Sequence, residues 1–303
     1  MENETNRHQI FDRVFLAGCS WHIRFVIPLI REVFKLDIPD DAFIESLSNE
    51  QVEHIYDDDG NETLVKRITD AIFKFDGNTY HFECESKNDG EIMLRISQYD
   101  MNIAFRNAEY DKYTVNMQLP ETAVIFLRNH RKIPDEGTIT YHKGNQELTH
   151  KVPFLKVKEY TLEELSNKHL YILLPFYLMR YEYAIKHTKN KYELIENEAR
   201  RVYDVIEYAY KVELIGMTEY ENILSLCKNV INVICENTEI EERLVEAMGY
   251  DTVILTAEER GVIKGIKQGK LEQLVELVRD GLLSISDAAR ISKKTEEEFR
   301  KLL

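Results

Sequence analysis

The sequence predicts an α/β domain over residues 1–160, followed by an all-α extension. Two observations favour this division. Short runs with strand-like alternation, separated by turn residues, fill much of 66–158. After residue 160 apolar residues recur at helical spacing, interrupted only by Pro175 and sparse glycines. We therefore expect a mixed sheet flanked by helices, then a helical extension over 161–255, and a Gly-repeat helix with a small helical pair over 256–303.

The composition is that of an ordinary globular protein. Hydrophobic residues make up 44% and charged residues 31%, which excludes collagen-like and wholly disordered chains. The longest apolar run, 170–179, is about half of the ~20 residues that span a bilayer, so no membrane segment is expected. The first residues lack the apolar core of a signal peptide, and the four cysteines form no CxxC motif. These features favour a cytoplasmic protein.

The net charge limits how the chain can interact with nucleic acid. It is −15, and neither half of the chain is basic. A protein that coats nucleic acid through bulk charge is therefore disfavoured. A nucleic-acid enzyme with a small local cleft is still compatible, because a divalent metal ion would supply positive charge there.

The individual elements follow from local patterns. Helical spacing predicts helices over 8–36 and 91–111, and Pro28 should kink the first helix or move its start. Residues 37–63 are acidic and rich in turn residues, which predicts a loop that is solvated at 57–60. A β-hairpin is expected over 66–87, with strands 68–75 and 79–87. A buried strand is expected at 122–127 and a further hairpin, with two Gly-containing turns, over 137–158.

The turn of the first hairpin decides which side chains share a face of the sheet. If the type I′ dipeptide Asp76-Gly77 forms the turn, Phe75 pairs with Asn78 and Asp70 lies opposite Glu83. A turn one residue later places Asp70 opposite Glu85 instead. Directly opposed residues share a face, so both registers bring the three carboxylates together. Alternation adds two more residues to this face, His81 and Lys87.

Three carboxylates on adjacent strands predict a cation site. Opposed Cβ atoms lie ~4.5–5.5 Å apart, and like charges at that separation are destabilising. A fold tolerates them when a cation binds among them or when one carboxylate keeps a proton. Carboxylate oxygens with room for water suit Mg²⁺ or Mn²⁺. The alternative interpretation is an exposed strand face whose charges extend into water.

These residues resemble the core of the PD-(D/E)XK nucleases, with Asp70, a turn and then HFECESK at 81–87. More narrowly, they resemble the recombination-promoting nuclease (Rpn) or transposase branch. Its second strand commonly reads like HIECQS and is followed by an Arg…Tyr-Asp helix, and RISQYD stands here at 95–100. FDRVF at 11–15 and the glycines Gly261, Gly265 and Gly269 also look like that family.

The resemblance implies a restriction-endonuclease-like fold and a metal-dependent DNA endonuclease that promotes recombination. It implies Mg²⁺ as the cofactor, with Mn²⁺ as a substitute, and DNA as the partner. Asp70 and Glu83 match the family's metal ligands, and the backbone carbonyl of Cys84 would complete the site. A bound ion would polarise the scissile phosphate and lower the pKa of a bound water.

Glu85 departs from the family pattern, because this position is usually Lys and in this branch often Gln. A Lys would stabilise the charge that develops on phosphate, which a carboxylate cannot do. Three interpretations stay open. Glu85 is a further ligand or general base, Lys87 takes the role of the Lys, or the enzyme is catalytically impaired. In the last case the chain is a DNA-binding or assembly protein that retains the nuclease fold.

Two further segments are candidates for contact with DNA. The helix expected over 91–111 carries a polar stripe, in which Arg95 and Tyr99 are the expected DNA contacts. The alternative is a solvated helix face with Tyr99 partly packed. Residues 128–158 carry seven Lys or Arg against three acids, which makes them a candidate DNA-facing strip, and the alternative is a solvated hairpin.

The small residues Gly261, Gly265 and Gly269 let helices approach closely, which favours homo-oligomers through the C-terminal helices. The alternative is a loose tether, because each glycine weakens a helix by ~1 kcal/mol. The charge of −15 favours a third class, a structural or interaction protein without a nucleic-acid role.

Overall fold

The computed structural model describes residues 10–11, 13–19, 23–47, 50–56, 62–68, 71–86, 90–128, 133–236, 238–249, 275, 278–279, 283–292 and 299–300, with backbone alone for 50–56, 62–68 and 290–291. The sequence predictions for Asp70, Lys87, residues 57–60 and the three repeat glycines concern residues outside this part of the chain. The chain divides into two compact units, Met1–Tyr250 and Asp251–Leu303.

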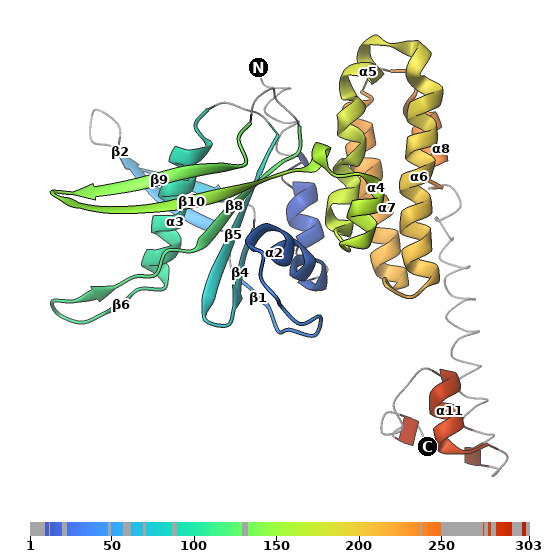
Figure 1. The fold of residues 1–303 in the computed structure, drawn as a ribbon, viewed down its shortest axis with the longest axis horizontal. Coiled ribbons are helices and arrows are strands. Elements are labelled where there is room, and N and C mark those ends of the chain that lie inside the picture. Colours follow the sequence, from blue (N-terminus) through green and yellow to red (C-terminus); the bar gives the residue numbers. More distant parts are fainter. Residues whose placement is uncertain are drawn as a thin grey trace. The chain divides into compact units, whose positions relative to one another are not determined.

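A six-stranded mixed sheet lies on one side of the first unit, and the helices α4 to α8, which span residues 162–247, lie on the other (Figure 1). The strand order of the sheet is β1-β4-β5-β8-β10-β9. β5, β8 and β10 run parallel to one another, and the other three strands are antiparallel to their neighbours. The strands are β1 (Glu45–Ser46), β4 (Ala71–Phe75), β5 (Asn78–Glu85), β8 (Glu121–Phe126), β9 (Glu136–Lys143) and β10 (Gln146–Lys156). The predicted α/β class with a mixed sheet is confirmed.

Helices cover both faces of the sheet. On one face, α3 (Ile92–Arg106) packs Ile92 and Ile96 against the inward side chains of β8, β9 and β10. On the other, α2 (Val26–Phe34) places Phe34 against the rings of Tyr80 and Phe82, with centroids 5.2 and 5.6 Å apart. α2 follows the short 3₁₀ helix η1 (Ile23–Phe25). Pro28 lies in the first turn of α2, where its missing N–H breaks no helical bond, so it sets the start of the helix.

The first hairpin has the register that a turn at Asp76-Gly77 predicts. Both turn residues have positive φ, 47° and 79°, as a type I′ turn requires. Phe75 pairs with Asn78, and Ala71 pairs with Phe82. One boundary was wrong, because β4 begins at Ala71, and residue 68 ends an earlier strand.

That earlier strand belongs to a pair that the sequence interpretation missed. β2 (Glu50–Tyr56) and β3 (Glu62–Ile68) form a two-stranded antiparallel sheet. The loop expected over 37–63 is therefore wrong for 50–56 and 62–63. Continuous backbone pairing from Glu50↔Ile68 to Tyr56↔Glu62 outweighs the low strand propensity of the acidic residues.

The second hairpin corrects another local prediction. β9 and β10 are joined at a single glycine turn, with Gly144 at φ 60°. Gly137, expected in a turn, lies inside β9. A Cβ at this position would come within 2.6 Å of Met93 Sδ on α3 and 2.7 Å of the Phe154 ring. The glycine therefore permits close packing of helix on sheet.

The helix expected over 91–111 ends earlier, at Arg106. A short antiparallel pair follows it, formed by β6 (Glu109–Tyr110) and β7 (Val115–Asn116). Tyr and Val favour extended backbone, which explains why the helix does not continue.

The helical extension is confirmed for the described residues after β10. Eleven residues around Pro175 form a 3₁₀ helix, η3, rather than an α-helix. The elements are η2 (Val157–Glu159), α4 (Leu162–Asn167), η3 (Tyr171–Tyr181), α5 (Glu182–His187), η4 (Lys189–Lys191), α6 (Tyr192–Lys211), α7 (Met217–Ile234) and α8 (Glu241–Ala247).

The second unit has its own small core. α11 (Ile285–Ser292) buries Ala288 and Ala289 together with Phe299. Ser284 caps α11 by accepting a hydrogen bond from the backbone N–H of Asp287 at 3.0 Å. Self-association through this unit stays a prediction.

Within the described residues, no single helix is both long enough and apolar enough to cross a bilayer. The bent pair Arg13–Cys19 and Ile23–Phe34 reaches that length and apolar composition only when the two helices are counted together.

Candidate active site

Alternation along β5 divides its side chains between the two faces of the sheet. Tyr80 and Phe82 contact α2, and the side chain of Cys84 shares their face. His81, Glu83 and Glu85 point toward α3 and are buried, with Glu83 4% and Glu85 5% exposed. An exposed strand face with charges in water is therefore the wrong interpretation for these two glutamates.

His81 lies between two carboxylates in the layer between sheet and helix. Its Nδ1 is 2.9 Å from Asp100 Oδ1 on α3, and its Nε2 is 3.0 Å from Glu83 Oε1. The hydroxyl of Thr122, on β8, donates to Asp100 Oδ1 at 2.6 Å. The Glu83 carboxylate is thus connected through His81 to a residue on the covering helix.

The two carboxylates keep His81 protonated. Burial by itself would lower the pKa of His81, but the hydrogen bonds to Asp100 and Glu83, together with their charges, outweigh it. The result raises its pKa from 6.5 to about 9. At neutral pH both ring nitrogens therefore donate, one to each carboxylate, and the imidazolium holds Glu83 in a fixed orientation.

Arg95 approaches both glutamates from the first turns of α3. Its Nη2 donates to Glu85 Oε2 at 2.6 Å, and its Nε lies 3.9 Å from Glu83 Oε2. Tyr99, one helical turn later, is buried, and its ring stands edge-on to His81 with centroids 6.1 Å apart. Of the two residues expected to contact DNA, Arg95 therefore lies beside the carboxylates and Tyr99 lies beside His81.

Sequence reasoning missed Asp100 and Thr122. Asp100 stands on the apolar side of α3, between Ile96 and Ile103, and both neighbours are buried. A carboxylate at a buried position needs a buried hydrogen-bond or charge partner. An acidic residue within the apolar spacing of α3 is therefore a signal in the sequence that could have identified Asp100. The identity of that partner depends on how α3 lies on the sheet.

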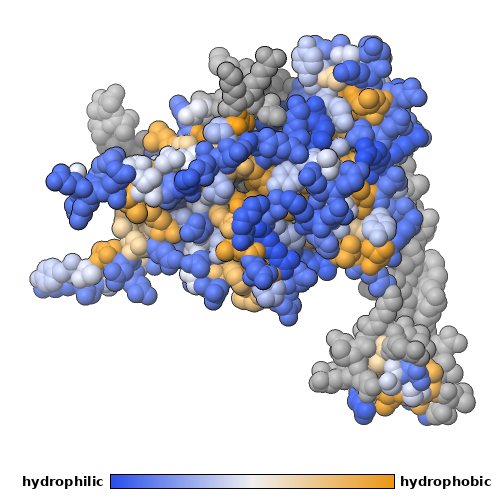
Figure 2. Space-filling model, viewed as in Figure 1, coloured by the Kyte–Doolittle hydropathy of each residue, from blue (hydrophilic) through white to orange (hydrophobic). Residues whose placement is uncertain are grey.

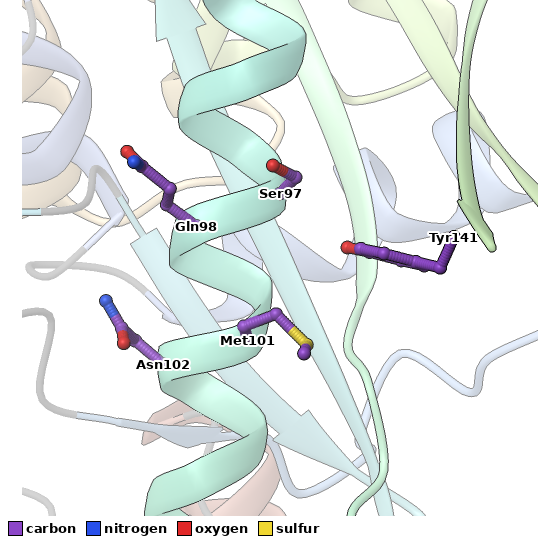
Figure 3. Close-up of a pocket in the computed structure, with 5 residues that line it drawn as sticks. All are labelled: Ser97, Gln98, Met101, Asn102 and Tyr141. Atoms are coloured by element: carbon purple, nitrogen blue, oxygen red, sulfur yellow. The ribbon is translucent and has the colours of Figure 1, made fainter. Parts of the chain in front are cut away.

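A second group of polar atoms lies between α3 and β9. Asp100 Oδ2 and the hydroxyl of Tyr141, on β9, are buried without a hydrogen-bond partner among the described residues. Burial, and then the charge of Asp100, raises the pKa of Tyr141. Figure 3 shows the Tyr141 hydroxyl directed at α3. An open pocket of about 400 Å³ beside it is lined by Ser97, Gln98, Met101, Asn102 and Tyr141.

The donor chemistry at Glu83 and Glu85 fits a hard divalent cation. Their carboxylates lie two residues apart on one strand and face the same helix, and water can complete an oxygen ligand set for Mg²⁺. Within the described residues, no group of three or more His, Cys, Asp or Glu side chains has the arrangement of a metal site. Asp70, the third expected carboxylate, is outside those residues, as is Lys87.

Most of the described basic side chains of 128–158 are engaged within the protein. Arg128 donates to Glu182 Oε2 at 2.6 Å and to the Ser86 carbonyl at 3.2 Å, which brings it next to the end of β5. Two lysines of this segment are also ion-paired, Lys151 with Glu136 and Lys156 with Asp135. Of this segment, Arg128 is thus the cation that the described contacts place nearest to the carboxylates.

No family model, curated protein or solved structure matches the chain.

Proposed function

We propose that the chain is a metal-dependent DNA endonuclease that hydrolyses phosphodiester bonds. The observation that carries the proposal is the buried pair of Glu83 and Glu85 with Arg95 beside both. Burying two carboxylates costs several kcal/mol each unless cations compensate them, and such clusters concentrate at functional sites. The resemblance over residues 70–100 supports the same assignment.

The roles follow from the contacts. Glu83 and Glu85 would hold the divalent ion, with Asp70 as the further ligand that the resemblance implies. A bound ion would polarise the scissile phosphate and lower the pKa of the attacking water. His81 and Asp100 orient Glu83 from behind, in the manner of residues that support metal ligands. Arg95 presents a guanidinium, whose planar donors match phosphate oxygens.

One contact favours a second candidate, a DNA-binding or assembly protein that retains the nuclease fold without catalysis. Arg95 already neutralises Glu85 at 2.6 Å. A cation that binds Glu85 must share the carboxylate with Arg95 or displace it, which weakens metal binding. This candidate requires binding of DNA without cleavage.

Nicking of supercoiled plasmid by the full chain tests the proposal, in Mg²⁺, in Mn²⁺ and in EDTA. Glu83→Gln removes a charge with little change in volume, and Glu121→Gln is the matched control at an exposed glutamate that opens β8. We expect metal-dependent nicking by the wild type and the control, and its loss in Glu83→Gln. Nicking by none of the three proteins in either metal would overturn the enzymatic function. Salt-dependent gel shifts would then separate the second candidate from a protein without a nucleic-acid role.

A further inference from the structure

A short arm follows α3, and its conformation is fixed by its own turn. β6 and β7 pair Glu109 with Asn116 and Tyr110 with Val115, and the arm projects from the body beyond the end of α3 (Figure 1). Asp111 N donates to the Thr114 carbonyl at 2.9 Å. Asp111 Oδ1 accepts from the backbone N–H groups of Tyr113 and Thr114 at 2.9 and 2.8 Å. These hydrogen bonds within the turn therefore fix the conformation of the arm, which does not depend on packing against the core.

The arm exposes large aromatic surfaces. Tyr110 is 81% exposed and Tyr113 is 86% exposed, and Lys112 Nζ lies 5.1 Å from the centre of the Tyr113 ring. Val115 and Phe105, near the base of the arm, are also more than half exposed, and Figure 2 shows apolar surface there. Clusters of exposed aromatic and apolar residues mark interaction sites. Flat rings beside a cation are suited to stacking against another flat, apolar group.

α3 connects this arm to the candidate active site, and its outward face carries no acid. The single acidic residue of α3 is Asp100, which is buried against His81. Arg95 and Arg106 lie near the two ends of the helix, and the amide side chains of Gln98 and Asn102 lie between them on one side (Figure 3). Arg95 is paired with Glu85, but in a chain of net charge −15 an acid-free helix face that ends in Arg106 is complementary to a polyanion.

The length of α3 allows one ligand to contact both the candidate active site and the β6–β7 arm. Arg95 and Arg106 are eleven residues apart, which is about 16 Å along a helix. A nucleotide chain that is held at Glu83 and Glu85 and continues along α3 would reach the arm.

We propose that the β6–β7 arm and the outward face of α3 bind an unpaired segment of DNA beside the cleavage site, with bases stacked on Tyr110 and Tyr113. This inference rests on the proposed function and names its substrate class. Stacking needs free base faces, which a duplex keeps inside its own stack. The charges on this surface, Arg95, Arg106 and Lys112 against Glu109 and Asp111, are too few to compensate the phosphates of a duplex.

Fluorescence anisotropy of labelled oligothymidine of about 16 nucleotides, near the upper limit of single-strand site sizes, tests the proposal with the full chain in EDTA. A duplex of the same length is the comparison. Tyr110→Ala and Tyr113→Ala each remove an aromatic ring, and Tyr113→Phe keeps the ring at residue 113. Tyr183→Ala is the matched control, at a tyrosine on α5 that is 76% exposed.

We expect the single strand to bind more tightly than the duplex. Each arm alanine substitution should weaken single-strand binding about 5- to 150-fold, because stacking contributes that much per base. Tyr113→Phe and Tyr183→Ala should bind as the wild type does. Equal binding by the wild type and both arm alanine variants would overturn the proposal, as would tighter binding of the duplex.

The test separates this inference from the proposed function, because binding in EDTA needs no hydrolysis. Plasmid nicking without tyrosine-dependent oligonucleotide binding would retain the endonuclease and remove the role of the arm. Tyrosine-dependent oligonucleotide binding without nicking would retain the role of the arm and remove the endonuclease. If the arm contacts a second copy of the chain instead, light scattering would show a dimer that Tyr113→Ala dissociates while oligonucleotide affinity is unchanged, and this would also overturn the proposal.

Discussion

Arg95 donates to Glu85 across the end of β5, with 2.6 Å between Nη2 and Oε2. In the resemblance to the nuclease pattern, Glu85 stands where that pattern usually has Lys, and the following helix brings a guanidinium to the same place. Because Arg95 and Glu85 neutralise each other, the pair does not replace the positive charge of such a Lys. Arg95 Nε also lies 3.9 Å from Glu83 Oε2, so one side chain serves both glutamates.

The competition between Arg95 and a metal ion can be measured. Arg95→Met keeps most of the side-chain length and removes the charge, so a divalent ion no longer shares Glu85 with a cation. We expect Mn²⁺ affinity to rise about tenfold or more, since a unit charge at this distance contributes on the order of 1–4 kcal/mol. Nicking should fall, because phosphate loses its guanidinium partner. Electron paramagnetic resonance titration measures the affinity, with Arg106→Met, at the other end of α3, as the control. Unchanged affinity in Arg95→Met would contradict the expectation.

Substitution of Glu85 distinguishes the three interpretations of this position. If Glu85 is a ligand or base, Glu85→Gln should cut nicking or demand more Mg²⁺, as should Asp70→Ala and Glu83→Ala. Its burial beside Glu83 favours this outcome. If Lys87 carries the role, Lys87→Ala should be the more damaging change and Glu85→Gln nearly silent. Higher nicking by Glu85→Lys than by the wild type would instead show that Glu85 impairs an ancestral site.

The Thr122 hydroxyl should contribute measurably to stability through Asp100. Thr122→Val keeps the shape of the side chain and removes the donor to Asp100 Oδ1, which leaves a buried carboxylate with one hydrogen bond fewer. We expect the free energy of unfolding to fall by about 1.5–3 kcal/mol, the usual contribution of a hydrogen bond to a charged group. Urea unfolding measures it, and Thr140→Val, at an exposed threonine of β9, is the matched control. Equal losses in the two variants would contradict a special role for Thr122.

Local chemistry explains which parts of this site the sequence can predict. The Asp76-Gly77 turn fixes the hairpin register within a few residues, and alternation along β5 places His81, Glu83 and Glu85 on one face. Helical spacing likewise brings Arg95 and Tyr99 to one side of a helix. The contact between His81 and Asp100 joins residues on different elements, and it depends on how α3 packs over β8, including the close approach at Gly137. The β2–β3 pair was missed because acidic composition indicated a loop, while pairing depends on a partner strand.

The raised pKa of His81 predicts a loss of stability on the alkaline side. The folded-state pKa, about 9, lies above the unfolded value of 6.5, so the folded state binds the proton more tightly. The resulting stabilisation is complete below about pH 6.5 and is lost as the pH rises through 9, by about 3 kcal/mol in total. Urea unfolding at pH 6, 7.5 and 9 should show the decline in the wild type. His81→Gln keeps a polar, neutral side chain and should flatten it. A free energy of unfolding that rises from pH 7 to 9, or an equal decline in the variant, would show that His81 does not bind its proton between Glu83 and Asp100.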